Sequence, residues 1–257
     1  MQGDFCHSCG QKKLDPQDWS LRRAAGDYWN ELSELDSKVF RTLRLLLLHP
    51  GQLTKQYLSG QRQPFVPPVK LYLAITTLFF FFGAQTEFNI EGFQRSANDQ
   101  RLGNIVKRLA ESKKVPYEVE LEKFNEGFHK MFSIAMGIGV VVFGFFVHLL
   151  YRRTEIYYAR SLVFALHFWA LFFVVVFVWR LAIHFGLKAP MQVFYVVLLP
   201  FLALSLRTVW PEKVSRYLPK LFALWAGTAM IYSMSVFLGI AAQLASYGSV
   251  MRDAMRR

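Results

Sequence analysis

The chain is poor in charged residues and in cysteine. Charged residues make up 19% of its 257 residues, against roughly 25% in a typical soluble protein. Hydrophobic residues make up 53%, with 25 phenylalanines, and this excludes a disordered tail. Two cysteines are too few for a mini-protein held together by disulfides. The class that remains is a membrane protein that crosses the bilayer several times.

Acidic residues are the scarcer of the two charge signs. The chain has 18 acidic and 30 basic residues, a net charge of +12. By charge alone it could bind nucleic acid, but its hydrophobicity does not fit that class. Up to Lys70 the chain holds ten basic and seven acidic residues, an excess that is weak for nucleic acid. We therefore expect no nucleic-acid partner, and we attribute the basic excess to membrane orientation.

Long uncharged runs predict five membrane-spanning helices. A helix needs about 20 apolar residues to cross about 30 Å of hydrocarbon. The uncharged runs place spans at about 69–85, 130–151, 161–185, 190–206 and 220–245. Pro200 interrupts the fourth run, and the fifth run predicts one tilted helix that leaves the membrane near Tyr247. The predicted fold is therefore an all-α integral membrane protein.

The distribution of Lys and Arg predicts a cytoplasmic N-terminus in a bacterial inner membrane. Ten basic residues precede the first span, three follow the second span, and four follow the fourth. These segments alternate as the positive-inside rule requires. The 86–129 loop has seven basic and eight acidic residues, so we expect it outside the cytoplasm. Arg252, Arg256 and Arg257 contradict the rule, unless the fifth run is re-entrant.

The residues before the first span predict a cytoplasmic helical head. Asp36–Leu48 reads as an amphipathic helix that ends at Pro50-Gly51, and a second short helix ends near Gly60. The basic residues of the first helix are Lys38, Arg41 and Arg44, and its apolar residues are Val39, Phe40, Leu43, Leu46 and Leu47. A basic amphipathic helix suits the anionic inner leaflet, but it could equally pack on the other helices.

Ionisable residues in or beside the spans are candidate ligand-binding residues. His148 and His167 fall in the inner halves of their spans, and Arg180 and His184 lie one turn apart near the outer side. Such residues often line polar cavities, although each could be an interhelical residue or an arginine that reaches the surface. Arg62, just before the membrane, could bind a phosphate or lipid headgroup or simply anchor the chain. The predicted spans contain no Asp or Glu, which disfavours a carboxylate proton relay.

The two cysteines are candidate metal ligands. Cys6 and Cys9 form a Cys-x2-Cys pair, which directs two thiolates to one point as half of a tetrahedral zinc site requires. A reducing cytoplasm disfavours a disulfide between them, and a redox pair would need a βαβ context that is missing here. His49 is a possible third ligand. Zinc is therefore a possible cofactor, with only half of its ligands present.

Three short motifs carry a family resemblance. In order they are Cys6-His7-Ser8-Cys9-Gly10-Gln11, His49-Pro50-Gly51 and Tyr57-Leu58-Ser59-Gly60-Gln61-Arg62. This order resembles a bacterial integral-membrane family, domain of unknown function 3667 (DUF3667), whose members usually open with two Cys-x2-Cys pairs that look like a small zinc ribbon. The resemblance implies half a zinc ribbon at 1–15, a helical head at 16–68 and a transmembrane domain at 69–250. It implies no activity, because none is established for the family.

The motif content favours a non-enzymatic function. The sequence has no phosphate-binding loop, no nucleophile elbow and no His-Glu-x-x-His motif. We expect a protein that handles a lipid headgroup or small solute, or that serves as a membrane scaffold or transport component. One alternative is a membrane-embedded enzyme acting on a lipid or isoprenoid phosphate, with His148, His167 and Arg62 converging on one cavity. Another is an adaptor whose zinc ribbon binds a protein partner.

Overall fold

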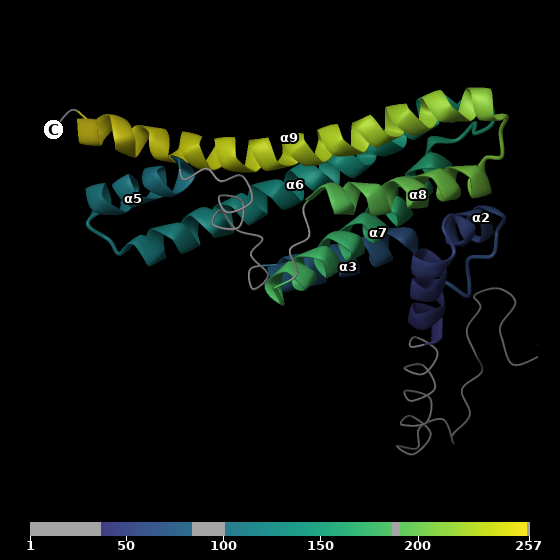
Figure 1. Cartoon of the computed structure of the whole chain (residues 1–257), viewed down its shortest axis with the longest axis horizontal. Coiled ribbons are helices and arrows are strands. Elements are labelled where there is room, and N and C mark those ends of the chain that lie inside the picture. The colour runs from purple at the N-terminus through teal and green to yellow at the C-terminus, as the bar shows by residue number, and fades with distance from the viewer. Residues whose placement is uncertain (1–36, 84–100, 187–190, 256–257) are drawn as a thin grey trace, which may run out of the picture.

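The protein is a bundle of helices, shown in Figure 1 as a computed structural model that describes residues 37–83, 101–186 and 191–255. Every regular element in those ranges is helical. The elements are a helix over 37–48, α2 (Gln52–Leu58), α3 (Pro68–Gly83), α5 (Arg101–Lys113), α6 (Tyr117–Tyr151), α7 (Tyr158–His184), α8 (Met191–Val209) and α9 (Val214–Met255). The all-α class predicted from the sequence is thus confirmed for the described residues.

Three helices are long and apolar enough to cross a membrane, namely α6, α7 and α9. Two shorter apolar helices, α3 and α8, accompany them. Each of the five runs predicted as a span is therefore helical, and three of them meet the requirement of length and composition on their own. These properties make the chain compatible with a membrane protein.

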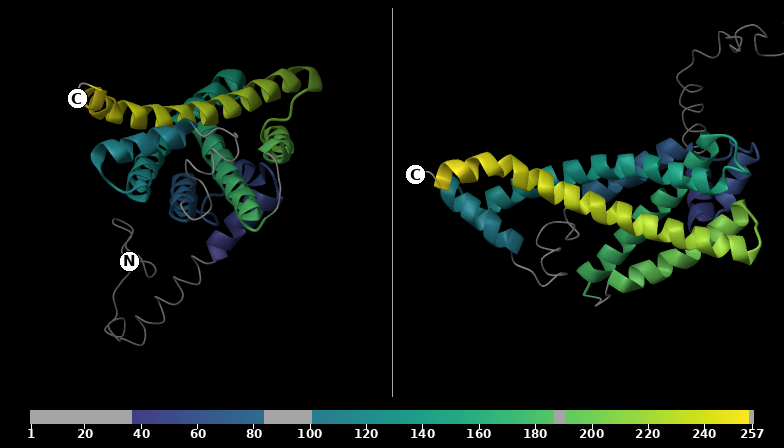
Figure 2. Two further views of the ribbon diagram at one scale, coloured as in Figure 1. Left: turned by 60° about the vertical axis from the view of Figure 1, so that its left-hand side comes forward. Right: turned by 90° about the horizontal axis from the view of Figure 1, so that it is seen from above.

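Helix α7 lies at the centre of the bundle (Figure 2), in contact with α2, α3, α6 and α8. Of its most apolar stretch, 67% is buried, against 33% for α6 and 28% for α9. A helix that is apolar on all sides belongs inside. Its buried aromatic residues extend the core to α6, where Phe143 stacks on Phe168 with ring centroids 5.4 Å apart. Helix α7 therefore helps to position α2, α3, α6 and α8.

Helices α6 and α9 lie side by side and have the most extensive contact in the bundle. They contain 35 and 42 residues, which gives lengths of about 52 Å and about 63 Å at about 1.5 Å per residue. Both exceed the ~30 Å thickness of the hydrocarbon layer. Helix α5 packs beside both of them at one end, so this end extends beyond the apolar part of the bundle.

The connections gather at two opposite ends of the molecule (Figures 1 and 2). One end holds α2, the turn between α6 and α7, and the connection between α8 and α9; the other holds α5 and the end of α9. Helix α9 continues without a break to Met255. The re-entrant alternative for the fifth run is therefore wrong, and the C-terminal segment lies at the α5 end.

Pro200 lies inside α8, which remains one helix as the predicted span at 190–206 requires. A proline removes one backbone hydrogen bond and usually bends or breaks a helix. Apolar bundles tolerate such residues because neighbouring groups compensate for the lost bond. The predicted turns around α2 are present: Gly51 and Gly60 flank this helix with φ of 79° and 100°.

Candidate functional site

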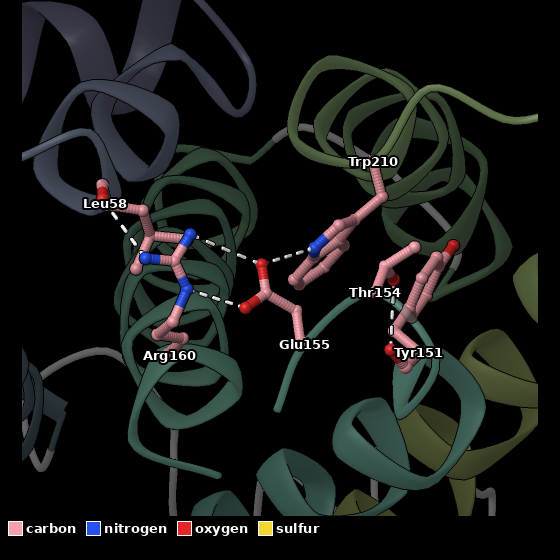
Figure 3. Close-up of polar contacts among 6 residues, drawn as sticks. All are labelled: Leu58, Tyr151, Thr154, Glu155, Arg160 and Trp210. Carbon is pink, nitrogen blue, oxygen red and sulfur yellow. Dashed lines mark hydrogen bonds and ion pairs between the residues drawn. The ribbon is translucent and has the colours of Figure 1, made fainter. Parts of the chain in front are cut away.

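A buried carboxylate organises the end of the molecule that holds α2. Glu155 lies in the turn between α6 and α7 and is only 5% exposed. Its carboxylate accepts hydrogen bonds from Arg160 Nε at 2.5 Å and from Trp210 Nε1 at 2.8 Å. Figure 3 shows the two donors approaching from opposite sides, one from α7 and one from the connection that follows α8. One side chain thus joins three parts of the chain.

The guanidinium of Arg160 extends this contact to α2. Its NH1 group donates to the backbone oxygen of Leu58 at 3.2 Å (Figure 3). That oxygen is among the last carbonyls of α2, which have no partner within the helix. Arg160 therefore neutralises Glu155 and caps α2 with the same side chain. Beside the cluster, the rings of Tyr151 and Trp210 stack with centroids 4.5 Å apart.

A second ion pair closes the connection between α8 and α9. Lys220 Nζ donates to both carboxylate oxygens of Glu212, at 2.7 Å and 2.8 Å. The same ammonium lies 4.1 Å from the centroid of the Tyr151 ring, a distance suited to a cation–π interaction. The two acidic residues of this end, Glu155 and Glu212, are therefore both neutralised by basic partners.

Basic residues greatly outnumber acidic residues at this end, which we call the basic end. We define it by residues 37–70, 152–160 and 207–220, which hold thirteen basic residues and two acidic ones. The basic residues are Lys38, Arg41, Arg44, Lys55, Arg62, Lys70, Arg152, Arg153, Arg160, Arg207, Lys213, Arg216 and Lys220. The α5 end is nearly balanced, with seven basic and five acidic residues over 101–130.

His167 is buried beneath α2 and is 3% exposed. Its Nδ1 is 2.9 Å from Thr54 Oγ1. Within the described ranges its Nε2 has no hydrogen-bond partner, and a cavity of about 20 Å³ lies beside the ring, lined also by Gly51 and Ser205. A cavity of this size holds about one water molecule. The histidine predicted as a ligand-binding residue therefore occupies a small closed site between α2, α7 and α8.

Replacing Thr54 with valine is expected to lower the free energy of unfolding by about 1 to 3 kcal/mol, because it leaves a buried imidazole nitrogen unpaired. Unfolding by SDS in mixed micelles, followed by tryptophan fluorescence, measures this loss. Thr228→Val is the matched control, since Thr228 is also buried but its hydroxyl donates only to Leu224 O of its own helix. Equal losses of unfolding free energy in both variants would show that the contact between Thr54 and His167 does not stabilise the protein.

Arg62 and His167 lie on either side of one aromatic ring. The ring of Tyr57 meets that of His167 edge to face with centroids 6.0 Å apart. The guanidinium carbon of Arg62 is 5.5 Å from the centroid of the same Tyr57 ring. Arg62 is exposed whereas His167 is buried. These two predicted residues are therefore neighbours through Tyr57, but they do not line the same cavity.

The other predicted residues lie elsewhere. His148, on α6, meets the ring of Tyr158 with centroids 6.1 Å apart, and Tyr158 is nine residues before His167, which places the two on opposite faces of α7. Arg180 is buried near the far end of α7 with its guanidinium 5.1 Å from the Trp179 ring. The side chain of His184 lies outside the described residues. The cavity beside His167 is lined by neither His148 nor Arg62, so the convergence required by the enzyme alternative is not seen there.

The candidate zinc ligands cannot be placed. Cys6 and Cys9 lie outside the described residues. Among the residues that are described, three or more His, Cys, Asp or Glu side chains do not gather at any point where they could hold a metal ion. Zinc binding by the cysteine pair therefore stays a prediction from the sequence.

Sequence reasoning missed the residues that join the basic end, chiefly Glu155 and Trp210. Their contact spans 55 positions in the chain, and no local pattern indicates it. One weak signal was present: Glu155 is the only acidic residue among three basic ones over 152–160. An isolated acid in a basic turn next to apolar helices suggests a buried partner for one of those bases.

The fold and the basic end place this protein in a class of helical proteins. Members of this class have an apolar bundle that is compatible with a membrane and one strongly basic end. Residues 36–80 match the family model described as "Protein of unknown function (DUF3667)". This match confirms, over residues 36–80, the resemblance to the DUF3667 family that the sequence motifs indicated. The matched residues cover the helix over 37–48, α2 and most of α3. Comparisons with curated proteins and with solved structures found no match.

Proposed function

We propose that this protein is a multi-pass inner-membrane protein whose basic end binds anionic phospholipid headgroups at the cytoplasmic surface. The observation that carries the proposal is the excess of thirteen basic over two acidic residues at this end. Both acids already have basic partners, so in the part of the chain that the structure describes the basic residues of this end outnumber the carboxylates that could neutralise them. Each basic residue near an anionic bilayer surface contributes about 1 kcal/mol to binding.

The surroundings of these cations suit a membrane interface. The helix over 37–48 buries Thr42 and Leu46 against the bundle, while Phe40 is 70% exposed and Leu48 is 68% exposed. Arg41 and Arg44 are exposed on the same helix. Exposed aromatic and aliphatic side chains beside arginines are typical of surfaces that insert into the headgroup region. The packing expected from the sequence is thus present, and the exposed side chains support the proposed contact with the membrane surface.

The orientation follows from the same charges. Lys and Arg gather on the cytoplasmic side of membrane proteins, which supports placing the basic end in the cytoplasm and the α5 end outside. The C-terminal arginines are then on the outer side. Short tails can keep positive charge outside when upstream helices have already fixed the topology. This arrangement agrees with α9 continuing as one helix to the α5 end.

The proposal is tested by native mass spectrometry of the full chain in detergent, incubated with equal amounts of phosphatidylglycerol and phosphatidylcholine that carry the same acyl chains. We expect more phosphatidylglycerol to be bound. The double substitution Arg41→Gln/Arg44→Gln should reduce its binding constant by about thirtyfold, at about 1 kcal/mol for each of the two charges. The matched control is Lys107→Gln/Arg108→Gln, an exposed basic pair on α5, for which binding should stay unchanged. Equal losses in the two double variants would contradict the proposal.

A further inference from the structure

A long groove lies between α6 and α9 in the apolar part of the bundle. Its volume is about 530 Å³, and small residues form its floor, among them Ala135, Gly139, Ala223 and Gly227. The hydroxyl of Ser235, which also lines the groove, donates to Ile231 O at 2.8 Å. Because that hydroxyl is already hydrogen-bonded within α9, the surface of the groove that a ligand would contact is apolar.

The groove has the length of a lipid chain. On α6 its lining runs from Ala135 to Leu150, which is about 22 Å at about 1.5 Å per residue. One leaflet of hydrocarbon is about 15 Å deep, half of the ~30 Å layer. A groove of this length accommodates one acyl chain that runs parallel to the helices.

Arginines surround the mouth of this groove at the basic end. Arg153 lies two residues after the end of α6 and three residues after Leu150 of the lining, and Arg216 precedes Ala223 by seven residues, on the same face of α9. Both arginines are exposed, as is Arg152 beside them. Within the described ranges the carboxylates of this end are already paired, Glu155 with Arg160 and Glu212 with Lys220. The arginines at the mouth are thus available to a phosphate.

We infer that the groove between α6 and α9 binds one anionic phospholipid, with an acyl chain along the groove and its phosphate on Arg153 and Arg216. This inference rests on the proposed function and adds the place and the stoichiometry of binding. A second copy of the chain fits the groove poorly. Two copies in the same membrane share one orientation, so the basic mouth of one would meet the basic mouth of the other. A phospholipid instead brings the opposite charge to the mouth and an apolar chain to the groove.

Filling the groove tests the inference directly. The position that a Cβ would take on Gly227 has no atom within 4 Å, so Gly227→Phe adds a ring to the groove without a clash at its root. Gly137→Phe is the matched control, because Gly137 is equally open but lines a different groove, between α3 and α6. Native mass spectrometry of the full chain with phosphatidylglycerol and phosphatidylcholine is the measurement.

We expect the groove of the wild-type chain to retain one phosphatidylglycerol molecule, in addition to those bound at Arg41 and Arg44. Gly227→Phe should weaken that binding about tenfold, equivalent to the lost burial of roughly two methylene groups, whereas Gly137→Phe should not. Arg153→Gln/Arg216→Gln, which leaves the bundle interior intact, should remove the preference for phosphatidylglycerol even if Gly227→Phe fails to fold.

Three outcomes overturn the inference. The first is that phosphatidylglycerol binding is unchanged in Gly227→Phe and in Arg153→Gln/Arg216→Gln but falls in Arg41→Gln/Arg44→Gln. This result would show that the groove is not the binding site, and it would leave the proposed function intact. Equal binding of the two lipids to the wild-type chain overturns the proposed function and the inference together. A dimer that Gly227→Phe dissociates would show that a second copy occupies the groove.

Discussion

Replacing Arg160 with methionine is expected to lower the free energy of unfolding by about 1 to 3 kcal/mol, because it removes a charged hydrogen-bond donor from the buried carboxylate of Glu155, although the Arg160 side chain itself is 42% exposed. Glu155 is 5% exposed, and without Arg160 it keeps only the indole N–H of Trp210 as a partner. The carbonyl of Leu58 loses its donor at the same time. Unfolding by SDS in mixed micelles, followed by tryptophan fluorescence, gives the change in free energy.

Two further variants show whether the charge of Glu155 is the cause. Arg160→Met/Glu155→Leu removes both charges, and we expect it to recover most of the loss, because a buried pair replaced by apolar side chains is often neutral in stability. Arg152→Met changes an exposed arginine in the same turn and should stay within about 0.5 kcal/mol of the wild type. If the double variant were as unstable as Arg160→Met alone, the hydrogen bond from Arg160 to Leu58 O in α2 would contribute more to stability than the ion pair with Glu155.

Replacing Gly51 with alanine is expected to destabilise the contact between α2 and α8 by about 2 to 5 kcal/mol. Gly51 has a φ of 79°, and a Cβ there would lie 2.7 Å from the backbone oxygen of Ser205. The left-handed conformation costs a residue with a side chain about 1 to 2 kcal/mol, and forcing an atom into a filled contact costs about 1 to 3 kcal/mol more. The same unfolding titration measures the sum.

Gly60→Ala separates the two contributions. Gly60 has a φ of 100°, at the other end of α2, but a Cβ there meets nothing within 4 Å. This variant should therefore show the backbone cost alone, about 1 to 2 kcal/mol. If Gly51→Ala and Gly60→Ala lost the same unfolding free energy, the close approach of Gly51 to Ser205 would make no contribution to the loss.

The helices were predictable because their signal is local. An uncharged run long enough to cross the bilayer has to be helical to satisfy its own backbone. The span predicted at 190–206 is helical in spite of Pro200. The charge count located the basic end, because the residues concerned lie in three sequence segments that alternate with the spans.

The site was less predictable because it depends on which faces of α7 meet which neighbours. The sequence places His148 and His167 at similar depths, and depth suggested a shared cavity. Depth does not specify the direction in which a side chain points, and Tyr158, which meets His148, is on the face of α7 opposite to His167. The contact of Glu155 with Trp210 was missed for a related reason, because a hydrogen bond between residues 55 positions apart produces no periodic pattern in the sequence.

The length of α9 has a mechanical consequence. This helix is one continuous rod of about 63 Å that begins at the basic end, where Lys220 is tied to Glu212, and ends beside α5. A rod pivoted at one end magnifies rotation, so a tilt of about 5° there displaces the far tip by about 5 Å, close to one helical turn. A tilt of α9 about its basic end would therefore move its α5 end much more than its basic end.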